Sequence, residues 1–239
     1  MNHFPAVDAD TVAWIDTDQM REIDRIMIED LHIELLQMME NAGRALAAVV
    51  MARSAPDTVA VYAGRGGNGG GGLVAARHLA NTGVDVTIVL GQEPAEMSPA
   101  AAHQLDIAER MGLPVVADPT AAHVAVDVAV DALVGYGLSG PLRGRVGGLA
   151  QAMRRTRGAV VSLDAPTGID ITNGSTVTDA VRPDATVTLC LPKTGLARPA
   201  DVGALFLADI SVPPAVSERI GGRPAPPFRL GPVLRIEHA

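Results

Sequence analysis

The chain has 239 residues, of which 48% are hydrophobic and 19% are charged, and its formal net charge is -8. This length suffices for one large domain or two small ones with a full hydrophobic core, and the composition leaves little room for long disorder. A nucleic-acid-binding surface is normally basic, so the negative charge argues against a nucleic-acid partner.

The cysteine content and the apolar runs bear on the compartment. Cys190 is the only cysteine, which excludes an internal disulfide and favours a reducing environment. It stands in the apolar run VTLCL, where a buried structural thiol is more frequent than a nucleophile. The first ten residues lack the basic start and apolar stretch of a signal peptide, and no apolar run approaches the roughly 20 residues that span a bilayer. We therefore expect a cytoplasmic protein without a membrane partner.

Two helices are expected at the beginning of the chain. Apolar residues recur every three or four positions from Met20 to Leu31, just after Asp16 and Thr17, which suit a helix N-cap. A second helix is expected over residues 34–52.

From residue 58 onward, short apolar runs alternate with helical stretches. The helical stretches are residues 72–83, 98–112 and 148–156. The apolar runs are continuous, which is typical of strands covered on both faces. The expected strands are TVAVYA (58–63), DVTIVL (85–90), LPVVA (113–117), VAVDVAVDALV (124–134), GAVVSLDA (158–165), ATVTLCLP (185–192) and ALFLADI (204–210).

The alternation of strand and helix predicts a three-layer α/β/α sandwich with a Rossmann-like, mostly parallel sheet and N-terminal helices. We expect a single domain over residues 1–239, with its core at about 14–213. Residues 214–239 are Pro-rich and are expected to extend over the surface.

Three segments rich in glycine follow expected strands: GRGGNGGGG at 64–72, GYGLSGPLRG at 135–144, and DAPTGID at 164–170. Ligands of open α/β sheets bind beyond the carboxyl ends of the strands, so the three segments predict one ligand site.

The first of these segments joins a strand to a helix that is expected to begin near Leu73. Successive glycines let backbone N–H groups approach an anion at a helix N-terminus. A flexible linker is the alternative, although linkers rarely interrupt a strand–helix unit. A phosphate-binding P-loop would need Lys followed by Ser or Thr, which is absent, and the G-x-G-x-x-G match is weak in so glycine-rich a run. Its informative side chains are those of Arg65 and Asn68, while Glu93 follows the next strand, where a ribose-binding acid could stand.

A carboxylate stands shortly before the second segment, at Asp131, and at the start of the third, at Asp164. Asp131 ends a strand made otherwise of Val and Ala, so it needs a cation, a hydrogen-bond donor or solvent. Asp164 ends the next strand, where a carboxylate facing a pocket suits general acid–base chemistry if partial burial raises its pKa. Both could instead be turn or capping aspartates, as could Asp170. Lys193 in LPKTG could touch a phosphate or be a solvated surface lysine.

Taken together, these segments resemble the NAD(P)H-hydrate epimerase family, whose domain is the YjeF N-terminal-like domain. The resemblance covers about residues 14–213, with motifs in the family's order and at family-like spacing. The segments that carry it are MREIDRIMIEDLHIELLQMMENAGRA, GNGGGGLVAARHL, DALVGYGLSGPLRG, SLDAPTGID, PKTGL and GALFLADISVP.

The resemblance implies an isomerase of nicotinamide nucleotide repair. Its substrate would be NADH or NADPH hydrated at C6 of the nicotinamide ring, and it would interconvert the R and S forms. It implies a homodimer, K+ as the cofactor, and a separate ADP- or ATP-dependent NAD(P)H-hydrate dehydratase as pathway partner.

The resemblance also implies roles for particular residues. Asp164 would be the acid–base residue near C6, and the K+ site would be formed by Asn68, Asp131 and Thr167, where the family usually has serine at the last position. The substrate would contact Gly67, Asn68, Gly69, Gly70, Gly71, Gly135, Tyr136, Gly137, Leu138, Ser139, Gly140, Pro141 and Asp164.

The glycine run departs from the family pattern N-N-G-G-D-G, because Gly67 and Gly71 stand where the family has asparagine and aspartate. Losing one or two hydrogen bonds could reduce affinity or rate up to about a hundredfold or more. Our first hypothesis is an active epimerase with an altered glycine loop. The alternatives are a weakened or inactive family member that acts as a nucleotide-binding or dimerisation scaffold, and a dinucleotide-dependent oxidoreductase.

Overall fold

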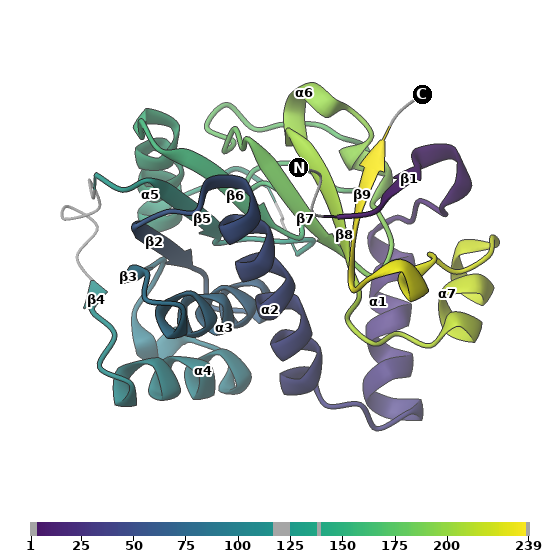
Figure 1. Cartoon of the computed structure of the whole chain (residues 1–239), viewed down its shortest axis with the longest axis horizontal. Coiled ribbons are helices and arrows are strands. Elements are labelled where there is room, and N and C mark those ends of the chain that lie inside the picture. Colours follow the sequence, from purple (N-terminus) through teal and green to yellow (C-terminus); the bar gives the residue numbers. More distant parts are fainter. Residues whose placement is uncertain (1–3, 117–124, 138–139, 238–239) are drawn as a thin grey trace.

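The computed structural model describes residues 4–116, 125–137 and 140–237, which form one mixed sheet with helices on both faces (Figure 1). Its strands are β1 (Ala6–Asp8), β2 (Thr58–Ala63), β3 (Asp85–Leu90), β4 (Val115–Val116), β5 (Val128–Ala132), β6 (Ala159–Leu163), β7 (Ala185–Leu189), β8 (Ala204–Ala208) and β9 (Val233–Glu237). Its α-helices are α1 (Thr17–Arg25), α2 (Leu35–Ser54), α3 (Gly67–Asn81), α4 (Pro99–Arg110), α5 (Gly144–Arg155), α6 (Pro199–Val202) and α7 (Pro214–Gly221). Within this part of the chain no helix is both long and apolar enough to cross a membrane.

The strand order is β1-β9-β8-β7-β6-β5-β2-β3-β4, and every pairing is parallel except that of β8 with β9. From β2 the chain moves outward through β3 to β4, and then returns to β5 and moves the other way through β6, β7 and β8. The order therefore reverses between β2 and β5. Such a reversal opens a crevice at the carboxyl ends of the two strands, which is where ligands of this fold class bind.

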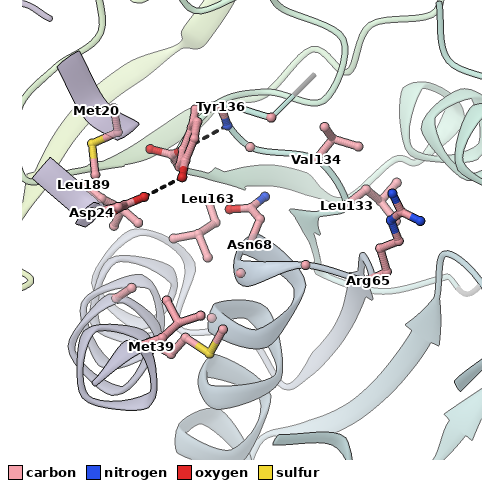
Figure 2. A pocket seen from close by; sticks show the side chains of 18 of the residues that line it. Met20, Asp24, Met39, Arg65, Asn68, Leu133, Val134, Tyr136, Leu163 and Leu189 are labelled. Carbon is pink, nitrogen blue, oxygen red and sulfur yellow. Dashed lines mark hydrogen bonds between the residues drawn. The ribbon is translucent and has the colours of Figure 1, made fainter. Parts of the chain in front are cut away.

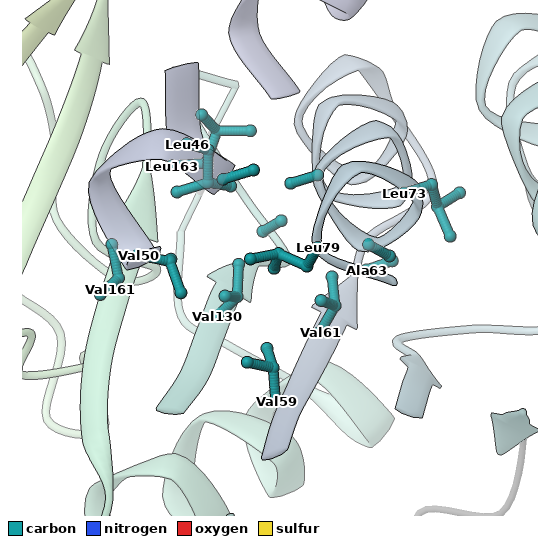
Figure 3. Packing of buried hydrophobic residues seen from close by; sticks show 14 of the residues in the cluster. Leu46, Val50, Val59, Val61, Ala63, Leu73, Leu79, Val130, Val161 and Leu163 are labelled. Carbon is teal, nitrogen blue, oxygen red and sulfur yellow. The ribbon is translucent and has the colours of Figure 1, made fainter. Parts of the chain in front are cut away.

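The expected burial of the sheet on both faces is confirmed. Val59, Val61 and Ala63 of β2 point toward α2 and α3 (Figure 3), within the cluster that joins α2, α3 and α4 to the sheet. The alternate residues Ala60 and Tyr62 pack on the other face with α5. Because both sets are buried, the strand reads as a continuous apolar run rather than as an alternating one.

The N-terminal helices form as the sequence predicts. Asp16 caps α1: its side chain accepts a hydrogen bond from the Gln19 backbone N–H at 2.9 Å, and the Gln19 side chain accepts one from the Asp16 N–H at 3.0 Å. The apolar residues Met20 and Ile23 of α1 are buried together with Met38 of α2.

Helix α3 begins at Gly67 and not near Leu73, so that part of the expectation was wrong. The first intrahelical bond of α3 runs from the Gly70 N–H to the Gly66 carbonyl at 3.0 Å. The glycines allow the helix to lie against the sheet backbone. A Cβ at position 69 would lie 1.7 Å from the Gly64 carbonyl oxygen, and one at position 72 would lie 2.5 Å from the Ala132 Cβ. Close packing onto β2 and β5 therefore outweighs the low helix propensity of glycine.

The segment after residue 213 is also not an extended surface tail. Residues 214–221 form α7, which contacts α1, and Val233–Glu237 form β9 between β8 and β1. Val233 and Leu234 of β9 are buried, so this strand packs into the core despite its Pro-rich surroundings.

Cys190 is buried as expected, and burial raises the pKa of its thiol to about 12. A thiol with so high a pKa is protonated near neutrality, which agrees with a structural role.

The packing of α3 predicts that two neighbouring glycines differ in their tolerance of alanine. Gly69→Ala is expected to lower the free energy of unfolding by about 1–3 kcal/mol or more, because backbone must move to accommodate the methyl group. Gly67→Ala is the matched control. Its Cβ would meet only the Met39 Cε at 4.0 Å, so we expect no loss and a gain of up to about 1 kcal/mol. Urea unfolding of both variants measures the difference, and equal stabilities would contradict this account of the glycine run.

Candidate active site

A cavity of about 680 Å³ lies at the carboxyl ends of the central strands. Its walls come from α1, α2, the beginning of α3 and the segments that follow β5 and β6. Figure 2 shows Met20 and Asp24 at one end, Arg65 at the other, and Asn68 between them. Most of the surface is apolar, with a few polar groups, and the volume falls in the usual range of small-molecule sites.

Asp164 follows β6 and forms a buried ion pair with Lys193. The distance from the Lys193 Nζ to the Asp164 Oδ1 is 2.5 Å, and the two side chains are 0% and 5% exposed. The other carboxylate oxygen, Oδ2, accepts a hydrogen bond from the Tyr136 backbone N–H at 3.1 Å. Asp164 has a φ of 62°, which is uncommon for a residue with a side chain and is frequent at functional positions.

Lys193 is therefore not the solvated surface lysine that was one of the two expectations. Its ammonium group donates to Asp164, to the Thr188 Oγ1 at 3.2 Å and to the Leu189 carbonyl at 2.8 Å. All three of its hydrogens thus have acceptors, as a buried ammonium requires. The sequence does hold a signal that we missed: Lys193 is the only lysine in the chain, in which every other basic side chain apart from histidine is arginine.

Asp131 and Thr167 lie together beneath the cavity, and both are fully buried. The Thr167 hydroxyl and N–H donate to the two carboxylate oxygens of Asp131 at 2.6 and 2.8 Å, and the Ser162 hydroxyl donates to it at 2.8 Å. Burial raises the pKa of Asp131, whereas the hydrogen bonds from Thr167 and Ser162 lower it. These donors are all neutral, so a bound cation would stabilise this carboxylate further.

Asn68 presents two buried polar atoms to the site. Its Oδ1 and Nδ2 have no hydrogen-bond partner among the described residues. The backbone of Gly135 passes between Asn68 and Asp164, because a Cβ at this glycine would lie 2.9 Å from the Asp164 Oδ2 and 3.2 Å from the Asn68 Oδ1. Buried amide groups are normally paired, so Asn68 is poised for a ligand or a cation.

Val134 connects this amide to the buried pair beneath it. Its backbone N–H donates to the Thr167 Oγ1 at 3.0 Å, directly before Gly135 in the chain. The Leu133 N–H donates to the Asp131 Oδ1 at 3.3 Å, and Gly135 lies beside Asn68, so the segment 133–135 adjoins all three residues of the expected K+ site. An unpaired amide oxygen, a buried carboxylate and a hydroxyl fit a hard cation with oxygen ligands. No group of three or more His, Cys, Asp or Glu side chains in the described ranges could hold a metal ion.

Asp24 is a second carboxyl group in the cavity wall, and sequence reasoning did not identify it. The Tyr136 hydroxyl donates a short hydrogen bond to the Asp24 Oδ2 (Figure 2). Burial raises the pKa of Asp24, the hydrogen bond from Tyr136 lowers it, and the charge of Asp164 raises it. Burial and the charge of Asp24 raise the pKa of Tyr136. Asp24 directly follows the buried Ile23 of α1, and nothing in the helical pattern distinguishes it from a solvated residue.

Only some of the other expected substrate-contacting residues line the cavity. Gly67, Asn68, Gly71, Gly135, Tyr136, Gly137 and Pro141 line the cavity. Gly69 and Gly70 do not line it, because they pack against Gly64 and Met39. Gly140 also lies outside its lining. Leu138 and Ser139 lie outside the described residues.

Gly71 stands where the family pattern has aspartate, and a buried leucine side chain packs beside it. A Cβ at this position would lie 2.8 Å from the Cδ2 of Leu163, whose side chain is fully buried. The space beside Gly71 is therefore occupied by a leucine methyl group, and an aspartate there would require Leu163 to move.

The raised pKa of Asp24 predicts a pH-dependent contribution to stability. A carboxyl whose pKa is higher in the folded than in the unfolded state stabilises the fold below its unfolded pKa, and this stabilisation is lost as the pH rises through its folded pKa. Asp24→Asn removes this titration and keeps an acceptor for Tyr136. The free energy of unfolding of the native chain, relative to Asp24→Asn, is therefore expected to fall as the pH rises from about 4.

Urea unfolding at several pH values measures this difference. Asp18→Asn is the matched control on the same helix, because the Asp18 side chain is 89% exposed. The raised pKa of Asp24 would be contradicted if the difference in free energy of unfolding between the native chain and Asp24→Asn did not change with pH. It would also be contradicted if Asp18→Asn gave the same pH-dependent difference.

Comparisons with known proteins agree with this arrangement. Residues 35–195 match the family model described as YjeF-related protein N-terminus. The chain is 39% identical to an NAD(P)H-hydrate epimerase of Dehalogenimonas lykanthroporepellens, with 98% of this chain and 96% of the relative covered. It is also 39% identical, over 81% of its length, to a bifunctional NAD(P)H-hydrate repair enzyme Nnr of Hyperthermus butylicus, of which it spans 37%.

A crystal structure of yeast ynu0 has the same fold. The TM-score is 0.80 at 23% identity, and the match covers 93% of this chain and 99% of the yeast chain. The family match covers most of the strands and loops that build the cavity, with α1 and Ile210 outside it, and the relative from Dehalogenimonas extends the match over almost the whole sequence. The chain belongs to the YjeF N-terminal family.

Proposed function

We propose that this chain is an epimerase that interconverts the R and S forms of hydrated NADH and NADPH. The observation that carries the proposal is the buried carboxylate of Asp164, which Lys193 holds at the wall of the cavity. The matched relatives named NAD(P)H-hydrate epimerase support it.

The proposed chemistry uses Asp164 as the group that carries a proton. In its protonated form, Asp164 gives a proton to the C6 hydroxyl as the C6–O bond breaks, and water leaves. The lone pair of the ring nitrogen forms a C=N bond, which gives a cationic ring. Water then adds to the other face of C6 and gives up a proton, which restores the protonated form of Asp164.

Lys193 does not line the cavity, so it acts on the reaction through Asp164. Its bond to Oδ1 fixes the carboxylate, and the Tyr136 N–H fixes Oδ2. Each carboxylate oxygen has more than one acceptor site, so Oδ2 can still accept a hydrogen bond from a substrate.

Asp24 supplies a candidate for the second face of the ring. It is the other aspartate that lines the cavity within the described ranges, and its raised pKa suits exchange of a proton. Tyr136 donates to Asp24 from its hydroxyl and to Asp164 from its backbone, which keeps the two carboxyl groups on separate parts of the wall.

K+ is proposed to bind through oxygen atoms of Asn68, Asp131 and Thr167. The support is the unpaired Oδ1 of Asn68 and the buried carboxylate of Asp131, whose described donors are neutral. A bound cation would supply positive charge beneath the cavity, while these residues fix the segment at Val134 and Gly135.

The scaffold alternative has less support. Asp131 and Asp164 both accept hydrogen bonds from neighbouring residues, and the space at Gly71 is filled by Leu163 rather than left open. A homodimer, and a separate ADP- or ATP-dependent dehydratase as pathway partner, remain predictions from the family resemblance.

Loss of the Asp164 carboxyl is expected to remove most of the activity. Asp164→Asn should lower kcat for conversion of the R to the S form of hydrated NADH by about 10²–10⁴-fold, the usual contribution of a general acid–base group. Lys193→Met should lower kcat with a smaller change in KM, because Lys193 does not touch the cavity. The assay compares purified protein with the spontaneous rate.

The control for this assay is Asp106→Asn, an exposed aspartate of α4, which should leave the rate unchanged. Because an unpaired buried charge costs about 3–5 kcal/mol, the folded fraction of Asp164→Asn and Lys193→Met is measured by circular dichroism. Native conversion no faster than the spontaneous rate, or folded Asp164→Asn with native kcat, would contradict the proposal.

The proposed K+ site predicts an ion-specific gain in stability. At equal ionic strength, KCl at about ten times its Kd should raise Tm by roughly 3 °C or more relative to tetramethylammonium chloride. Asn68→Ala should lose this gain, while Asn173→Ala, on an exposed turn, should keep it. A scan of thermal unfolding measures both. An equal Tm in the two salts would overturn the site.

A further inference from the structure

A second recess, of about 480 Å³, adjoins the candidate active site. The two cavities share five lining residues that follow β2 and β5: Arg65, Leu133, Val134, Arg143 and Val146. The recess then continues over the residues after β3, Gly91 and Gln92 among them, and away from Asp164. The two cavities therefore lie on opposite sides of the crevice at which the strand order reverses.

The recess is rich in guanidinium groups, although the whole chain is acidic. It is lined by Arg65, Arg143 and Arg145, and by the carboxylates Glu93 and Glu96. Arg145 is paired with Glu93. Neither Arg65 nor Arg143 has a side-chain hydrogen bond or ion pair among the described residues. Local positive charge is thus available to an anion, even at a net charge of -8.

The unpaired buried atoms of the recess are donors. The Nε2 of Gln92 and the Nη1 of Arg145 are buried without a hydrogen-bond partner in the described part of the chain, and the Arg145 side chain is 20% exposed. Buried donors of this kind are normally satisfied. A ligand rich in acceptor oxygens would satisfy both of them.

The beginning of α3 lies between the two cavities. Residues Arg65 to Asn68 line the first cavity and Arg65 also lines the recess. Since the first intrahelical bond is made by the Gly70 N–H, the N–H groups before it are free of such bonds. An anion that spans the crevice would meet these groups and the positive end of the helix dipole.

We propose that this recess binds the adenosine half of the hydrated dinucleotide and holds one of its phosphate groups through Arg65, Arg143 and Arg145. The inference rests on the proposed function, which places the nicotinamide half beside Asp164. The phosphate has two possible sources: the bridging diphosphate of both substrates, or the 2′-phosphate that only NADPH carries.

Binding is tested without turnover, by calorimetric titration of the purified chain with ADP-ribose, with 2′-phospho-ADP-ribose and with nicotinamide mononucleotide. The double variant Arg65→Gln/Arg143→Gln should have an affinity about tenfold or more lower for the ADP-ribose ligand whose phosphate the recess holds. This is the effect of losing one or two charge-assisted hydrogen bonds. Arg155→Gln, on the exposed end of α5, is the matched control and should bind all three ligands as the native chain does.

The two sources give different results. If the 2′-phosphate occupies the recess, 2′-phospho-ADP-ribose binds more tightly than ADP-ribose and the double variant removes the difference. If the diphosphate occupies it, the two ligands bind equally and weaken equally. Native affinity of the double variant for both ligands, or a larger loss for the mononucleotide than for either of them, would overturn the inference.

The test also separates the inference from the proposed function. A chain that binds ADP-ribose through these arginines but does not convert the R form contradicts the proposed function alone. If the native chain converts the R form and the double variant has an unchanged KM for hydrated NADH and hydrated NADPH, only the proposed role of the recess is contradicted.

Discussion

The ion pair between Lys193 and Asp164 is the interaction on which the architecture of the site depends. A buried ammonium and a buried carboxylate are each costly to desolvate, and their cost is offset only when both are fully hydrogen-bonded. Lys193 has acceptors for its three hydrogens, and Asp164 receives donors at both oxygens. Removing either partner would leave the other as an uncompensated charge in the interior.

The pair also joins parts of the chain that are distant in sequence. Asp164 directly follows β6, while Lys193 follows β7. The backbone on each side of Lys193 bonds to Ile15, because Ile15 N–H donates to Pro192 and Thr194 N–H donates to Ile15. Ile15 directly precedes the cap of α1, the helix that carries Asp24. The same segment thus holds one carboxyl group directly and positions the helix that presents the other.

Much of the fold was predictable because the sheet is buried on both faces. Continuous apolar runs identified β2, β3, β5, β6, β7 and β8, and the loops at their carboxyl ends identified Asp131 and Asp164. The start of α3 was not predictable from propensity, because the need of Gly69 to lie against Gly64 becomes visible only in three dimensions. Strand β9 was missed because its five residues stand near prolines and are too few to give a clear strand pattern. Its pairing with β8 and β1 becomes visible only in the folded structure.

The side chains that complete the site were harder to predict than the loops that hold it. Lys193 is marked only by being the one lysine of the chain, which is a weak indication of burial. Asp24 directly follows the buried Ile23 of α1, and only the position of Tyr136 identifies it as part of a cavity. The glycine run is explained by packing as much as by ligand binding. Its position at the crevice suits a ligand, whereas Gly69 and Gly72 permit a close approach between α3 and the sheet.

We propose that Asp164, held by Lys193, promotes loss and return of water at C6 of the hydrated ring. Incubation of the R form in water enriched in ¹⁸O, followed by mass spectrometry, tests this route directly. Each enzyme-catalysed conversion to the S form is expected to introduce one ¹⁸O atom at C6, above the exchange seen without protein. Conversion to the S form with retention of the original oxygen would contradict it.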